Sequence, residues 1–169
     1  MDTHLDAKGR LKSSAVYIGG GYTLRPAVSV KNKRRILAAS ILSWFALTGA
    51  LIPVTKASQT AYVIIPFAFS ALPLFLATRA AVSLMLGGEC MTRMKAERIS
   101  GRLPLSSLVA SMLSGAAFLG AAVIAILNWD ELLAVDMLFG ALSLLMTLAA
   151  AFVYSKSRTI KACKVDEIE

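Results

Sequence analysis

Four long apolar stretches, separated by polar segments, dominate the chain. They cover approximately residues 36–55, 61–86, 104–128 and 132–154. Each reaches the roughly 20 residues that a helix needs to cross a bilayer, and none has the continuous polar face of a water-exposed helix. Because backbone groups within a bilayer must bond inside their own segment, we expect all four stretches to be transmembrane helices.

Composition supports a membrane protein. Hydrophobic residues make up 57% of the 169 residues and charged residues 17%, whereas soluble domains are about 45–50% apolar and about 25% charged. The net charge of +8 comes from cations that flank the apolar stretches. This placement predicts attraction to a bilayer with anionic head groups, and it is not the basic stripe of a domain that binds nucleic acid.

The distribution of cations predicts the orientation. All lysines and arginines except Lys56 and Arg79 lie before the first stretch, between the second and third, or after the fourth. The positive-inside rule makes these three regions cytoplasmic, with both chain ends inside. The opposite connections, residues 55–60 and 128–131, are short. The sequence therefore predicts an all-α, integral membrane four-helix bundle that runs up-down-up-down.

The two ends of the chain are expected to be cytoplasmic tails, residues 1–35 and 155–169. The first tail is longer than the n-region of an ordinary signal peptide, which predicts that the first apolar stretch is not cleaved. Residues 14–26 carry β-type residues around three glycines, which predicts a short hairpin or a flexible tail. Four cations beside the first stretch are expected to bind lipid head groups: Lys31, Lys33, Arg34 and Arg35.

The connection between the second and third stretches, residues 88–102, is expected to be helical. We predict that it either continues the second span into the cytoplasm or lies on the membrane surface. Glu89 precedes Arg93 by four residues, which is a favourable spacing for an ion pair on a helix.

Arg79 interrupts the second apolar stretch. It follows Tyr62, an expected boundary residue, by about 26 Å of helix. This places it near the inner head groups, where its stem can lie in lipid while the guanidinium reaches a phosphate. The alternative is a buried charge in a transport pathway. Pro66 and Pro73 each remove a helical hydrogen bond and predict a bent second helix.

Asp136 is the acid of the fourth apolar stretch. It lies about 10 Å of helix beyond Trp129, an aromatic residue typical of the membrane interface. A carboxylate there is costly unless it is paired, protonated or hydrated. We expect an acid of the outer rim that is held by Lys56 or by water; the alternative is a carboxylate that binds a proton or a cation.

Small residues recur every four positions in the third stretch, at Ser107, Ser111 and Gly115, with Gly120 on a neighbouring row of the helix. Such residues let neighbouring helices approach closely in membranes. We expect them to pack inside the bundle, with homodimerisation as the competing use.

Chemical motifs are lacking in the sequence. The single histidine, His4, lies in the first tail, and Cys90 and Cys163 are far apart without metal-ligand spacing. We therefore predict a protein that is not an enzyme and binds no cofactor or metal. The expected function is an accessory or scaffold subunit of a membrane complex, with another membrane protein or a second copy as partner. The alternative is a small homo-oligomeric transporter or channel that uses Asp136. The short loops favour a plasma membrane, specifically a bacterial inner membrane.

Overall fold

The computed structural model describes residues 2–5, 11–14, 21–25, 27–53, 55–87, 91–129 and 134–164. The elements in chain order are β1 (Asp2–Leu5), β2 (Leu11–Ser14), β3 (Tyr22–Arg25), α1 (Val30–Leu51), α2 (Lys56–Gln59), α3 (Ala61–Phe69), α4 (Ala71–Leu86), α5 (Arg93–Glu97), the π-helix η1 (Arg98–Arg102), α6 (Leu103–Leu127), α7 (Ala134–Ser157) and β4 (Lys161–Lys164).

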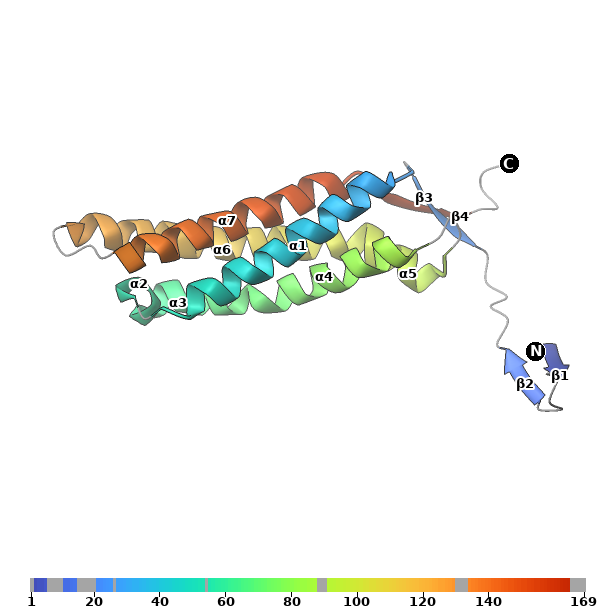
Figure 1. Ribbon diagram of the computed structural model, residues 1–169. Helices are drawn as coiled ribbons and strands as arrows, with labels where there is room; N and C mark the ends of the chain where they lie inside the picture. The colour runs from blue at the N-terminus through green and yellow to red at the C-terminus, as the bar shows by residue number, and fades with distance from the viewer. Residues whose placement is uncertain are drawn as a thin grey trace.

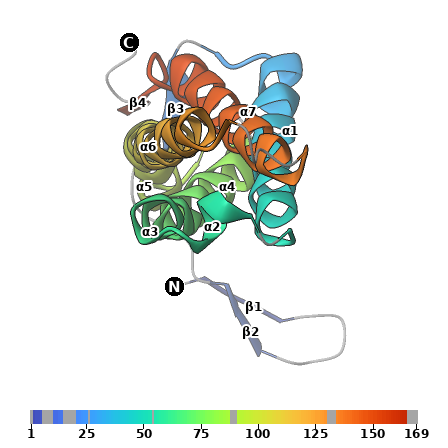
Figure 2. The same cartoon turned by 90° about the vertical axis from the view of Figure 1, so that its left-hand side faces the viewer.

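Four helical segments within the described residues are long and apolar enough to cross a membrane: Val30–Leu51, Ala61–Leu86, Arg93–Leu127 and Ala134–Ser157. Helix α7 packs against α1 and α6, and α4 also packs against both, so the segments close into a bundle (Figure 2). The prediction of an all-α chain with four helices of membrane length is confirmed.

The outer surface of the bundle is apolar. Only 28% to 33% of the most apolar part of each long segment is buried inside the molecule. Large side chains such as Phe45, Leu119 and Ile126 point outward. Exposure of such a continuous apolar surface to water would be unfavourable, whereas acyl chains solvate it.

The two ends of the bundle differ (Figure 1). At one end β3 pairs antiparallel with β4, with Tyr22 opposite Lys164, and we call this the sheet end. Tyr22 also exchanges two backbone hydrogen bonds of 3.0 Å with Met91, so three distant segments of the chain meet here. The opposite end carries α2, and we call it the α2 end.

The chain ends are more structured than two simple tails. The stretch 14–26, for which a hairpin or a flexible tail was expected, lies partly outside the described residues, and its described part Tyr22–Arg25 pairs with Lys161–Lys164. A separate hairpin joins β1 to β2. Ile160, which precedes β4, is buried in the cluster of apolar residues at the sheet end.

Helix α1 begins six residues before the expected start at 36 and ends at Leu51, not 55. Its first amide groups are capped by Ser29, whose Oγ accepts from the Asn32 N–H at 3.3 Å. The helix ends at Leu51, two residues before Pro53, which has no N–H to continue the helical hydrogen bonding. The four cations assigned to the tail therefore lie in the first turns of α1.

The second apolar segment consists of two helices, α3 and α4, that meet at Ser70. The interruption falls between Pro66 and Pro73, the two residues from which a bent helix was expected. Pro73 has no N–H to donate to the carbonyl of Phe69, and the Ser70 N–H divides its hydrogen bonding between Pro66 and Phe67.

The segment before the third apolar stretch is helical from Arg93 onward, as expected. Residues Arg93–Arg102 continue directly into α6, so they extend the third segment and not the second. Pro104 explains the π-helix at this point. It has no N–H for the carbonyl four residues earlier, and the Leu103 N–H bonds to the Arg98 carbonyl five residues back. Arg93 pairs with Glu97 at 2.7 Å; Glu89 lies outside the described residues.

Candidate functional site

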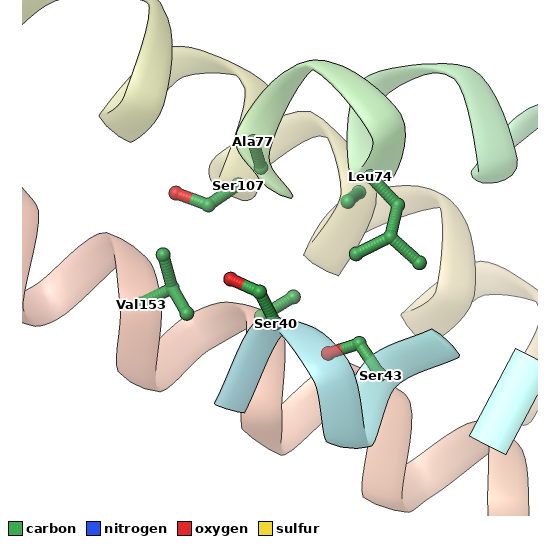
Figure 3. Close-up of a pocket in the computed structure, with 8 residues that line it drawn as sticks. Ser40, Ser43, Leu74, Ala77, Ser107 and Val153 are labelled. Carbon is green, nitrogen blue, oxygen red and sulfur yellow. The ribbon is translucent and has the colours of Figure 1, made fainter. Parts of the chain in front are cut away.

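A small cavity lies at the centre of the bundle (Figure 3). It is lined by residues of α1, α4, α6 and α7: Ser40, Ser43, Leu74, Ala77, Ser107, Ala110, Ala150 and Val153. Its volume is about 10 Å³. Because one water molecule needs about 10–15 Å³ by this measure, the cavity holds one water at most.

Three serine hydroxyls line this cavity. Ser40, Ser43 and Ser107 each donate to a carbonyl four residues earlier in their own helix, at 3.0, 2.9 and 2.8 Å. Their protons are thus engaged, and their remaining lone pairs can accept from a water molecule. The lining contains no base to activate a serine. The cavity can hold one water molecule inside the bundle, but its serines have no base to make them nucleophiles.

Asp136 lies at the α2 end, near the start of α7, and is half-buried. Its Oδ1 accepts a hydrogen bond of 2.9 Å from the backbone N–H of Lys56, the first residue of α2. A carboxylate in this position stabilises the start of the short helix by a charge-assisted hydrogen bond. The structure therefore brings together the two residues that the sequence paired, through the Lys56 backbone.

Arg79 is exposed on the outer face of α4. Its own carbonyl accepts from Ser83 Oγ at 2.9 Å, and its side chain lies away from the bundle interior. This placement suits the expected anchor at a lipid head group. It does not suit the alternative of a buried charge in a pathway through the bundle.

The small residues of the third segment lie in helix contacts inside the bundle. Ser107 is buried, and Ser111 Oγ donates to the Thr147 carbonyl of α7 at 3.4 Å. A Cβ built on Gly115 would lie 3.5 Å from Thr147, and one on Gly120 would lie only 2.8 Å from Val63 of α3.

The cations of α1 divide into two kinds. Lys31, Arg34 and Arg35 are exposed, whereas Lys33 is half-buried. Lys33 Nζ donates to the Gly87 carbonyl at the end of α4, at 3.1 Å. A cation at a helix C-terminus also interacts favourably with the helix dipole. This contact could not be predicted from the sequence, because the two residues lie far apart in the chain.

Polar contacts between helices were also missed. Trp44 Nε1 donates to Thr78 Oγ1 at 3.0 Å, which joins α1 to α4. Thr147 Oγ1 lies 3.0 Å from Ser114 Oγ, which joins α7 to α6. Hydroxyls in apolar stretches signal such contacts in general, but their partners depend on the packing.

Among the residues that the structure describes, no group of three or more His, Cys, Asp or Glu side chains is placed to hold a metal ion. Comparison with protein-family models, with curated proteins and with solved structures finds no match to this chain.

Proposed function

We propose that the chain is a multi-pass integral membrane protein that crosses the bilayer four times, up-down-up-down, with both ends in the cytoplasm. The apolar outer surface of the bundle supports the insertion. Within the described parts of residues 21–164, the lysines and arginines other than Lys56 and Arg79 lie in elements that meet at the sheet end, which supports the orientation. The compact loops favour a bacterial inner membrane.

Cysteine labelling tests this orientation. In a background without Cys90 and Cys163, we expect Gln59→Cys to react with a membrane-impermeant maleimide in intact cells. Lys95→Cys should react only after the cells are permeabilised. Both side chains are exposed in the structure, so whether each position is labelled depends on the side of the membrane that the reagent reaches. The reverse labelling pattern would contradict the proposed orientation.

We further propose that the protein is a non-catalytic accessory or scaffold subunit of a membrane complex. The observation that carries this proposal is the small cavity among α1, α4, α6 and α7, which holds one water at most. This cavity has no room for a substrate. The outer face of the bundle and its sheet end remain as the surfaces through which it acts on other molecules.

Purification under mild conditions tests the scaffold function. We expect a tagged copy, expressed at its natural level and extracted in a mild detergent, to retain another membrane protein at constant stoichiometry. Repeated recovery of the chain alone, after crosslinking in the intact membrane, would contradict the proposal.

The alternative is a small homo-oligomeric transporter or channel that uses Asp136. It is favoured by the half-buried position of this carboxylate in an apolar helix. The hydrogen bond from the Lys56 N–H instead supports a structural role, because it engages one carboxylate oxygen within the protomer.

Two variants of Asp136 separate these roles. Asp136→Asn keeps an acceptor oxygen, so we expect its free energy of unfolding to change by less than about 1 kcal/mol, and Asp136→Ala to lose about 1–2 kcal/mol. Proton and cation flux in proteoliposomes should be equal for the native protein and Asp136→Asn. A flux that Asp136→Asn abolishes would instead establish the transporter.

A further inference from the structure

An arginine inside an apolar helix face can anchor a phospholipid, and the surroundings of Arg79 suit this use. Helix α4 presents Leu72, Phe75 and Leu76 on its outer face, where all three are exposed. Arg79 follows them at helical spacing and therefore lies on the same face, on the side of the sheet end. Val82 and Leu86 are exposed beyond Arg79, so the cation lies within an apolar face and its guanidinium must extend toward the sheet end to meet a phosphate.

The depth of Arg79 also fits a phosphate contact. It lies eight residues before Gly87, which is about 12 Å of helix from the end of α4. A guanidinium on a long stem can reach from this depth toward the head-group level while its methylenes remain in contact with acyl chains. Arginine also binds phosphate in a bidentate manner, which an ammonium group does not.

Arg34 lies in the first turns of α1, which packs against α4 (Figure 2), at the level where α4 ends and therefore about 12 Å of helix nearer the sheet end than Arg79. The residue before it, Lys33, donates to the Gly87 carbonyl, which fixes the first turns of α1 against the end of α4. Arg34 itself is exposed.

Arg102 lies in η1, which also packs against α4. It precedes Gly120 by five helical turns and so lies on the side of the third segment that meets the second. It is also exposed. In the described part of the chain, no ion pair joins Arg34, Arg79 or Arg102 to a carboxylate.

We propose that the outer face of α4 binds one anionic phospholipid, whose phosphate is held by Arg79 as its side chain extends toward the sheet end, where Arg34 and Arg102 add positive charge around the head group. Three cations at this end favour a head group without a compensating positive charge. The acyl chains lie along Leu72 and Phe75. This site rests on the proposed membrane insertion, and it adds a selective lipid contact to the general attraction of a basic surface.

Native mass spectrometry of the full chain in a mild non-ionic detergent tests the site. Phosphatidylglycerol and phosphatidylcholine with identical acyl chains are the two probes. We expect one phosphatidylglycerol to be retained per chain in preference to phosphatidylcholine, and Arg79→Gln to lower this retention about tenfold. An excess of inorganic phosphate should not displace the lipid, because the acyl chains contribute to binding.

Arg35→Gln is the matched control. Arg35 is exposed in the same turn of α1 as Arg34, but it lies about 200° around the helix from Lys33 and hence away from α4. We expect this variant to change retention less than twofold. Arg79→Lys keeps the charge, so its lipid retention should fall between that of the native protein and that of Arg79→Gln. Thermal unfolding of each variant checks that a loss of retention does not come from a folding defect.

Several results would overturn the lipid site. Equal losses in Arg79→Gln and Arg35→Gln would show a diffuse basic surface, and equal retention of both lipids would show apolar contact alone. Displacement by inorganic phosphate would show an anion site without lipid. Each of these results would contradict the lipid site and leave the proposed membrane insertion intact. Recovery of the untreated protein in a detergent-free soluble fraction would contradict the membrane insertion itself.

Discussion

Replacing Phe139 by alanine is expected to lower the free energy of unfolding by about 3–5 kcal/mol. Phe139 of α7 is fully buried, and its ring lies 5.2 Å from that of Phe67 in α3 at an angle of 52°. In lipid the hydrophobic effect contributes little to helix association, so the bundle depends on packing contacts of this kind. Removal of the ring leaves a void that the surrounding helices fill only in part.

Phe45→Ala is the matched control for this prediction. Phe45 is a phenylalanine of α1 that is 69% exposed, so we expect its loss to cost less than about 1 kcal/mol. Both variants can be measured by reversible unfolding in mixed micelles, with helical circular dichroism as the signal. Equal losses in the two variants would show that the rings of Phe67 and Phe139 do not hold α3 and α7 together.

The contrast between these two phenylalanines shows what the sequence could not predict. Each apolar stretch was recognisable because a span needs about 20 apolar residues, whatever its neighbours. A helix that is apolar all round gives no sign of which face is buried, so Phe45 and Phe139 are equivalent in the sequence. Only the packing distinguishes them, through the position of Phe67.

The ends of the helices depended on contacts between distant residues. The early start of α1 was missed because the cations after Ser29 read as a polar tail, although Lys33 reaches the end of α4. The pairing of Tyr22 with Lys164 was missed for the same reason, since neither short segment predicts the other. Pro104 was visible in the sequence, but it signals a helix start as readily as the π-helix that it accompanies here.

The candidate site was also predictable from the sequence only in part. Asp136 and Lys56 were paired from their common position near one membrane boundary, and the structure joins them through a backbone N–H that no residue pattern specifies. Arg79 was placed near a head group by its distance along the helix. Arg34 and Arg102, the further cations of the proposed lipid site, come from α1 and η1, and only the packing of these helices against α4 suggests that they act with Arg79.

Gly120 is the small residue of the third segment whose substitution should be most disruptive. A Cβ at this position would lie 2.8 Å from Val63 Cγ2, closer than van der Waals contact allows. Val63 is fully buried and its branched side chain has little freedom to move. The glycine therefore permits α3 and α6 to approach closely, as small residues do in membrane helix contacts.

We expect Gly120→Val to lower the free energy of unfolding by about 2–3 kcal/mol, because α3 must move away from α6. Gly140→Val is the matched control, since a Cβ on Gly140 of α7 meets no atom within 4 Å. This control should leave stability within about 0.5 kcal/mol of the native protein. A second substitution, Val63→Ala, should restore part of the loss in Gly120→Val by making room for the new side chain. If Gly120→Val is as stable as Gly140→Val, or if Val63→Ala restores nothing, then the close approach of α3 to α6 does not hold the second and third segments together.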